Sequence, residues 1–308
     1  MEPDPELLRR LDPVLHPFAA ARTDLSLNSL AAVRDSLDVR RAETIAEIDA
    51  TGVDIVDDDV AGVPVRFYRG APSPSPTVIY CHAGAFMLGN LDTDHRQCVE
   101  LARRGGCTVV SVDYRLAPEH PFPAALDDAT TVLQWTWTAG PDLGLDRDRL
   151  VLAGNSAGAA LAAGLAQRAA AGQTPPIAGA LLHQPVLDDR PTASKTEFDS
   201  TPGFDGAATE AMWRHYLGAT GPSAAAVPAR SHQIIGAAST FITCSEVDPL
   251  RDEALDYAGR LMSAGVRTDL HVFGGTCHGF DSLCPDWEVS QTLLAMQAAA
   301  LRRFFELQ

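Results

Sequence analysis

The sequence predicts an α/β protein with a mostly parallel sheet that is covered by helices on both faces. Over most of the chain, short and continuously apolar runs alternate with longer stretches of helical periodicity. Such runs are typical of strands buried on both faces, and their alternation with helices is typical of parallel sheets. At 308 residues, with 46% hydrophobic and 21% charged residues, the composition excludes disordered, collagen-like and membrane-bundle proteins.

The expected elements follow in order along the chain. Apolar residues from Leu7 to Leu15 recur at helical spacing, and a second helical stretch covers 28–47. Two runs rich in β-branched residues, 53–56 and 63–68, predict a hairpin. After a linker rich in proline and serine, strands are expected at 77–81, 108–112, 150–153, 180–182, 240–244 and 268–273. Helices are expected at 94–104, 124–136, 157–171, 251–264 and 287–305.

One segment, 188–239, interrupts this alternation. It separates two strands by about fifty residues, which is longer than an ordinary connection. It contains one helical stretch, 209–217, between flanks that are rich in proline and glycine. We expect this insertion to fold together with the N-terminal helices over one end of the sheet, as a cap.

Charge and targeting signals narrow the partners and the location. The formal net charge is −16 and Lys195 is the single lysine, whereas nucleic acids and anionic membranes attract clustered basic residues. The N-terminal residues lack the basic and apolar regions of a signal peptide. The most apolar stretch, 151–171, is interrupted by Asn155, Ser156 and several glycines. The six cysteines form no C-x-x-C pair, so no metal site is expected. We expect a cytoplasmic protein without nucleic-acid partners or stable membrane insertion.

The residues Gly154-Asn155-Ser156-Ala157-Gly158 form a G-x-S-x-G pattern between a predicted strand and a predicted helix. Such a sharp turn lifts a serine out of the chain, and the small residues on either side let the backbone pass. A free hydroxyl is a poor nucleophile, so a base must lie within hydrogen-bonding distance of it. The same residues also fit an ordinary tight turn that exposes a serine, so this motif alone leaves both interpretations open.

A second motif, 80–86, follows the strand expected at 77–81 and consists largely of small residues. A loop of this kind can direct backbone N–H groups at a developing oxyanion, together with the N–H of the residue after the nucleophile. We expect Gly84, Ala85 and Ala157 to be these donors. His82 and Asn155 are expected to hold the surrounding loops in shape.

An acid and a base that would activate Ser156 must follow it in the chain, in that order. Asp248 comes directly after the strand expected at 240–244, and His278 comes after the strand expected at 268–273. Because parallel strands end at one edge of the sheet, all three side chains are expected there. His183, which also follows a strand, is the alternative base.

The run 113–128, D-Y-R-L-A-P-E-H-P-F-P-A-A-L-D-D, completes a set of motifs over residues 76–282. Together they resemble the hormone-sensitive-lipase-like family of α/β-hydrolases, the bacterial family IV esterases. The resemblance implies the α/β-hydrolase fold with a helical cap, and a catalytic triad of Ser156, Asp248 and His278 that needs no metal or organic cofactor. It also implies N-terminal cap helices at 1–48, a catalytic domain at 49–308, and a second part of the cap inserted at 188–238.

Two motifs depart from the pattern of this family. The usual His-Gly-Gly-Gly loop reads His82-Ala83-Gly84-Ala85 here, and the aspartate of the usual Gly-Asp-Ser-Ala-Gly turn is replaced by Asn155. The two added methyl groups reshape or narrow the acyl site, so the acyl preference stays open. Five aromatic residues are candidates for the substrate pocket, although each also fits ordinary packing between cap and core: Phe86, Tyr114, Phe204, Trp213 and Tyr216.

The sequence therefore predicts a carboxylic ester hydrolase that acts on short- to medium-chain acyl esters of small molecules through an acyl-serine intermediate. A deacetylase or acyltransferase of specialised metabolism would use the same triad and stays open as an alternative. A ligand-binding receptor on a hydrolase fold is a weaker alternative, because such receptors usually lose a triad member and this chain keeps all three. A homodimer along an edge strand or the C-terminal helix is also left open.

Overall fold

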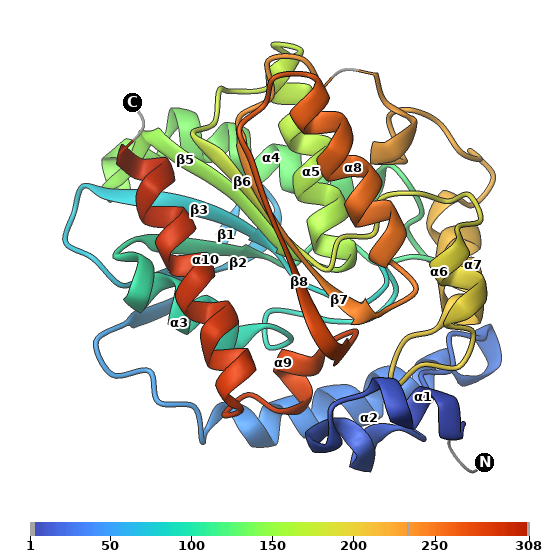
Figure 1. The fold of residues 1–308 in the computed structure, drawn as a ribbon. Coiled ribbons are helices and arrows are strands. Elements are labelled where there is room, and N and C mark those ends of the chain that lie inside the picture. Colours follow the sequence, from blue (N-terminus) through green and yellow to red (C-terminus); the bar gives the residue numbers. More distant parts are fainter. Residues whose placement is uncertain (1–3, 233, 307–308) are drawn as a thin grey trace.

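The computed structural model describes residues 4–232 and 234–306, and its centre is one twisted sheet (Figure 1). The described strands lie in the order β1-β2-β4-β3-β5-β6-β7-β8. The pairs β1–β2 and β2–β4 are antiparallel and all others are parallel, which confirms the predicted hairpin and the mostly parallel sheet. Their bounds are β1 Asp54–Val60, β2 Val63–Arg69, β3 Ser75–Cys81, β4 Thr108–Val112, β5 Leu145–Asn155, β6 Gly179–His183, β7 Ser239–Val247 and β8 Thr268–Cys277.

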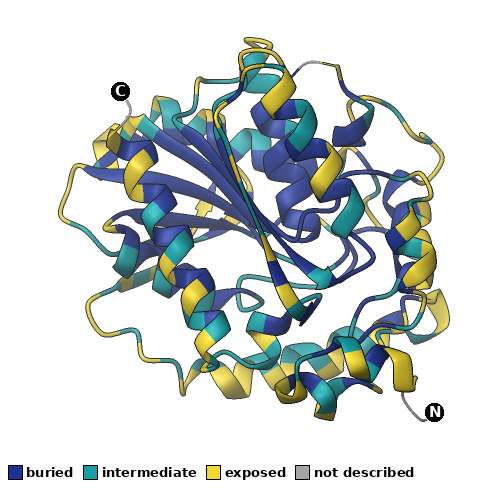
Figure 2. Cartoon of the chain, in the orientation of Figure 1, coloured by how far each residue is buried: buried dark blue, intermediate teal, exposed yellow. Residues whose placement is uncertain are grey.

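Helices cover both faces of this sheet, as predicted (Figure 1). One face packs against α3 (His95–Gly105) and α10 (Glu288–Glu306), and the other against α4 (Ala124–Thr138), α5 (Ala157–Ala170) and α8 (Arg251–Ser263). Successive side chains of a strand point to opposite faces. In β3, accordingly, Val78 and Tyr80 join one core cluster, while Ile79 and Cys81 join the other. Figure 2 shows the central strands and the helix faces turned toward them as buried.

Several elements are longer or more numerous than the sequence predicts. β5 begins at Leu145 and β8 continues to Cys277, because both strands extend past their continuously apolar stretches into polar residues that still pair in the sheet. The helical stretch expected from Leu7 to Leu15 is divided between α1 (Pro5–Arg10) and η1 (Pro13–Phe18). The short helices η2 (Gly140–Leu143), η3 (Pro228–Arg230), α6 (Ala193–Glu197) and α9 (Phe280–Leu283) were not expected. They are too short to show a helical period in the sequence.

The N-terminal helices and the insertion lie together beside the ends of the parallel strands (Figure 1). The N-terminal part contains α1 (Pro5–Arg10) and α2 (Leu27–Ile45), and the insertion contains α6 and α7 (Gly206–Leu217). The N–H of Gly203 donates to the carbonyl of Ala21 at 3.0 Å, and Arg22 Nη2 donates to the carbonyl of Ser200 at 2.6 Å. A two-part cap would make such contacts, and the division into cap and catalytic domain stays a prediction.

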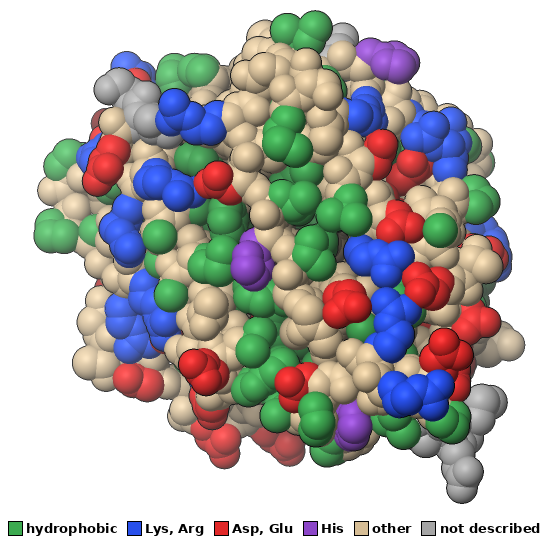
Figure 3. Space-filling view, viewed as in Figure 1, with side chains coloured by type: hydrophobic (Ala, Val, Ile, Leu, Met, Phe, Trp, Pro, Cys, Tyr) green, Lys and Arg blue, Asp and Glu red, His purple; other side chains and the backbone are tan. Residues whose placement is uncertain are grey.

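The surface shows no block of one charge on the face seen in Figure 3, where basic and acidic side chains alternate. Hydrophobic side chains gather along the middle of this face. Strand β8 lies at the edge of the sheet and leaves Val272 exposed by 38%.

Within residues 4–232 and 234–306, none of the helices combines the length and apolar character that a bilayer span requires.

Candidate active site

Ser156 stands at the junction of β5 and α5 in a strained conformation, with φ +56° and ψ −115°. Residues other than glycine rarely adopt a positive φ, and they keep it where the surrounding structure enforces it. The flanking glycines are required by packing. A Cβ on Gly158 would overlap the carbonyl of Cys81, and a Cβ on Gly154 would overlap the backbone of Gly158. The G-x-S-x-G pattern is therefore a sharp turn that presents the serine, and not an ordinary tight turn.

Three side chains from separate strand ends form one hydrogen-bonded chain. Ser156 directly follows β5, Asp248 directly follows β7, and His278 directly follows β8. His278 Nε2 lies 2.9 Å from Ser156 Oγ, and His278 Nδ1 lies 2.8 Å from Asp248 Oδ2. Asp248 is fully buried and its Oδ1 accepts a hydrogen bond from the N–H of Leu250 at 2.8 Å. The structure thus brings together the three residues that the sequence singled out.

The alternative base, His183, does not take part in this chain. Its Nδ1 lies 2.8 Å from Thr243 Oγ1 and its Nε2 lies 3.2 Å from Asp281 Oδ1, so both ring nitrogens are used elsewhere. The ring is buried and packs edge-on against Phe280. His278 is the histidine that reaches the serine.

The loop after β3 is shaped for exposing backbone N–H groups. Gly84 has φ +132° and Ala85 has φ +56°. A Cβ on Gly84 would overlap the backbone of Leu88, so this position requires glycine, whereas Ala85 holds its left-handed conformation in spite of a methyl group. Within the described chain, the N–H groups of Gly84 and Ala85 make no hydrogen bond. Ala157 is the first residue of α5, where N–H groups have no partner within the helix.

His82 supports this loop from inside, as expected. Its Nδ1 lies 2.7 Å from the carbonyl of Ala83, and its ring stacks on Tyr114 with 4.2 Å between the ring centroids. Burial lowers the pKa of His82 to about 4, so the ring is neutral at physiological pH. The hydroxyl of Tyr114 donates to the carbonyl of His82 at 2.7 Å. Tyr114 is thus buried against the loop and holds it in place, and its predicted place in the substrate pocket stays a prediction.

Asp94 is a support of the same loop that the sequence analysis missed. Its Oδ2 accepts hydrogen bonds from the N–H of Ala83 at 2.9 Å and from the hydroxyl of Tyr80 at 3.0 Å. Burial raises the pKa of the Asp94 carboxyl. The sequence places Asp94 at the start of a helix, which suggests a capping residue, but its side chain makes no capping hydrogen bond.

Asn155 was predicted to support the loop, and this prediction is wrong. Its Oδ1 is buried and has no hydrogen-bond partner among the described residues. The N–H of Ala83, in the loop, donates to Asp94 instead. Within the described residues, Oδ1 of Asn155 therefore adds no hydrogen bond to the loop.

Aromatic side chains of the insertion pack against the triad and against the loop after β3. Phe204 lies against His278 with 4.9 Å between the ring centroids. Phe86 stacks on Tyr216 at 3.7 Å and lies 6.0 Å from Trp213, again between centroids. All four aromatic rings are buried, and Ser156 is only 3% exposed. Phe204 therefore lies beside the triad, and Phe86, Trp213 and Tyr216 form one packed cluster that includes the loop. Their place in a substrate pocket stays a prediction.

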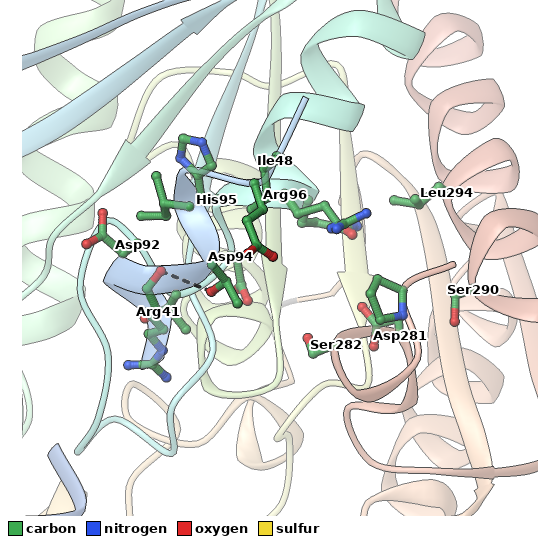
Figure 4. A pocket seen from close by; sticks show the side chains of 16 residues that line it. Arg41, Ile48, Asp92, Asp94, His95, Arg96, Asp281, Ser282, Ser290 and Leu294 are labelled. Carbon is green, nitrogen blue, oxygen red and sulfur yellow. Dashed lines mark hydrogen bonds between the residues drawn. The ribbon is translucent and has the colours of Figure 1, made fainter. Parts of the chain in front are cut away.

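A cavity of about 190 Å³ lies apart from the triad, between the end of α2, the start of α3 and the segment from α9 to α10 (Figure 4). Arg41, Asp94 and Asp281 are among its lining residues, and none of Ser156, Asp248 and His278 is. Two of these carboxylates support the site, because Asp94 holds Ala83 and Asp281 holds His183. Among the described residues, no cluster of three or more His, Cys, Asp or Glu side chains could hold a metal ion.

Comparisons with known proteins agree with this geometry. A family model described as an alpha/beta hydrolase fold matches residues 78–282. Esterase LipI of Mycobacterium tuberculosis is 37% identical over 90% of this chain and 87% of its own length, and ethyl acetate hydrolase of Pseudomonas putida is 32% identical over 78% of each. Among solved structures, esterase LipW from Mycobacterium marinum is 58% identical, covers 98% of each chain and has a TM-score of 0.96. A bacterial heroin esterase is 33% identical over 96% of this chain and 98% of its own, with a TM-score of 0.90.

Proposed function

The chain belongs to the hormone-sensitive-lipase-like family of α/β-hydrolases and is a carboxylesterase, and we propose that it hydrolyses esters of short- to medium-chain acids through an acyl-serine on Ser156. The observation that carries the proposal is the continuous chain from Ser156 Oγ through His278 to Asp248, with distances of 2.9 and 2.8 Å. A carboxylate can only accept, so Nδ1 carries the proton and Nε2 is free to accept one from the serine.

The reaction then follows from this arrangement. His278 Nε2 takes the hydroxyl proton while Ser156 Oγ attacks the ester carbonyl, and Asp248 stabilises the imidazolium. The tetrahedral intermediate collapses, His278 returns the proton to the leaving alcohol, and the acyl group stays on Ser156. A water molecule then gives a proton to His278 and attacks the acyl carbon. As this second tetrahedral intermediate collapses, the bond to Ser156 Oγ breaks, His278 returns the proton to that oxygen, and the acid is released.

The N–H groups of Gly84, Ala85 and Ala157 are the proposed donors to the oxyanion. In a related chemistry, loss of one such donor costs about 2.7–4 kcal/mol of barrier. The absence of competing hydrogen bonds at Gly84 and Ala85 supports the proposal. The left-handed conformation of Ala85 also supports it, because such strain concentrates at functional sites.

The preference for short to medium acyl chains is supported by the packing around the serine. Phe86, Trp213 and Tyr216 form one buried aromatic cluster beside the loop, and Phe204 lies on His278. The Pseudomonas putida relative is named for ethyl acetate, an ester of a short acid.

Acyl transfer to another acceptor would use the same acyl-serine. The cytoplasmic location and the homodimer stay predictions.

Labelling with a fluorophosphonate probe tests the nucleophile. We expect the wild-type protein to be labelled and Ser156→Ala to be unlabelled, and equal labelling of both would remove Ser156 from the mechanism. A series of p-nitrophenyl esters from acetate to palmitate tests the acyl preference, with kcat/KM expected to decline beyond medium chains. Product analysis in the presence of added alcohols distinguishes hydrolysis from acyl transfer, and hydrolysis is expected to dominate.

A further inference from the structure

The segment 183–186, which begins with the last residue of β6, holds the backbone of Ser156 on both sides. The N–H of Ser156 donates to the carbonyl of His183 at 2.8 Å, and the N–H of Val186 donates to the carbonyl of Ser156 at 3.2 Å. The segment is itself tied to β7, because the N–H of Gln184 donates to the carbonyl of Thr243 at 2.7 Å. The main chain of the nucleophile is thus fixed to this segment.

The side chain of Gln184 holds both backbone neighbours of His278. Its Oε1 accepts a hydrogen bond from the N–H of Gly279 at 2.7 Å, and its Nε2 donates to the carbonyl of Cys277 at 3.2 Å. Nε2 also donates to Ser245 Oγ at 2.7 Å, and that hydroxyl donates to the same Cys277 carbonyl at 3.0 Å. One amide group therefore binds the chain immediately before and immediately after His278.

Only a primary amide can make this set of bonds at position 184. The N–H of Gly279 needs an acceptor and the carbonyl of Cys277 needs a donor, and a glutamine side chain offers both. Gln184 is fully buried and has φ +44°, a left-handed conformation that is strained for a residue with a Cβ. Strain of this kind persists where the surrounding contacts enforce it, which the three side-chain hydrogen bonds and the bond to Thr243 do.

We propose that Gln184 is a positioning residue that sets the distance between His278 and Ser156. The segment 183–186 holds the serine through its backbone and the histidine loop through the Gln184 amide, so the two reacting groups share one support. His183 adds a second link, because its ring bonds Asp281, three residues after His278. The inference rests on the proposed function, in which His278 deprotonates Ser156.

Gln184→Met tests this role, because methionine is close to glutamine in volume and can make none of the three hydrogen bonds. The matched control is Gln167→Met: Gln167 is also buried, and its Nε2 donates to the carbonyl of Pro228 and the hydroxyl of Tyr257, each at 2.9 Å, without contact to the triad. Both variants lose buried hydrogen bonds, so both are expected to melt at lower temperatures. They should differ in catalysis.

We expect kcat of Gln184→Met toward p-nitrophenyl acetate to fall by about 10- to 100-fold with KM changed by less than about twofold, because small misplacements of reacting groups have effects of this size. The rate of fluorophosphonate labelling of the folded protein should fall by the same factor. Gln167→Met should keep kcat within about twofold of the wild type. A kcat for Gln184→Met equal to that of the control, or a rise in KM at unchanged kcat, would overturn the proposal.

If Gln184→Met does not fold, Ser245→Ala decides the question. It removes one of the two donors to the Cys277 carbonyl and a partner of Gln184 while the glutamine stays in place. We expect a fall in kcat of about two- to fivefold at unchanged KM, and an unchanged kcat would overturn the proposal. Failure of the proposed function itself would show differently, as activity and labelling that survive Ser156→Ala.

Discussion

Replacing Asp94 by alanine tests how the loop that carries Gly84 and Ala85 is held. One carboxylate oxygen of Asp94 accepts from both the N–H of Ala83 and the hydroxyl of Tyr80. In Asp94→Ala the buried hydroxyl of Tyr80 and the half-buried N–H of Ala83 both lose their acceptor, and each such group costs about 1–3 kcal/mol. The free energy of unfolding should therefore fall by about 2–6 kcal/mol, a large part of the ~5–15 kcal/mol that stabilises a typical domain.

The same substitution should impair catalysis, because Ala83 directly precedes the proposed oxyanion donor Gly84. Loss of one correctly placed donor corresponds to a fall in kcat of about 100-fold or more. Asp94→Asn is the matched control: its amide oxygen can accept both hydrogen bonds, and its neutral side chain avoids the burial penalty that raises the pKa of Asp94. The asparagine variant should keep both stability and kcat close to those of the wild type.

Urea unfolding followed by tryptophan fluorescence gives the stability of each variant, and p-nitrophenyl acetate hydrolysis gives kcat. The reasoning fails if the alanine variant unfolds at the same urea concentration as the asparagine variant. It also fails if the alanine variant is less stable yet keeps the wild-type kcat, since Asp94 would then stabilise the fold without positioning the loop.

Three further predictions follow from the site. Asp248→Asn should lower kcat by about 10⁴-fold without loss of the fold, because an amide that donates to Nδ1 of His278 leaves the proton on Nε2, facing Ser156. Steady-state kinetics measures kcat and circular dichroism checks the fold. A loss of kcat under tenfold would contradict the role assigned to Asp248. The pKa of His82 is lowered by burial from 6.5 to about 4, so its contribution to stability is complete above pH 6.5 and is lost as the pH falls through 4. His82→Gln should remove up to about 3 kcal/mol of this acid sensitivity from the free energy of unfolding, measured between pH 7 and 4. An unchanged pH dependence of unfolding would be the contrary result. Ala85→Gly should relieve the left-handed strain at φ +56° and remove a methyl group from the loop, so kcat/KM for p-nitrophenyl hexanoate should rise relative to acetate; a constant ratio would mean that Ala85 does not limit the acyl site.

The order of the strands and helices could be predicted from the sequence because each element carries its own local pattern. The triad could be predicted for a related reason. Ser156, Asp248 and His278 each come at the end of a parallel strand, and the parallel arrangement alone brings those ends to one edge of the sheet. The need for glycine on both sides of Ser156 could also be predicted, because a Cβ at Gly154 or Gly158 would overlap the backbone of a neighbouring segment.

What supports the triad was decided only by the tertiary structure. Asp94 resembles a helix cap in sequence and instead binds a loop eleven residues earlier, while Tyr114 looks like a pocket residue and is buried beneath His82. Asn155 was expected to accept a hydrogen bond from the loop, but its Oδ1 has no partner among the described residues, and Asp94 accepts from the N–H of Ala83. Nothing around Gln184 in the sequence marks it, because its role depends on β6, β7 and β8 lying side by side. Hydrogen bonds between distant segments have no local period, so the sequence determines the reacting groups and the packing of the whole chain determines what holds them.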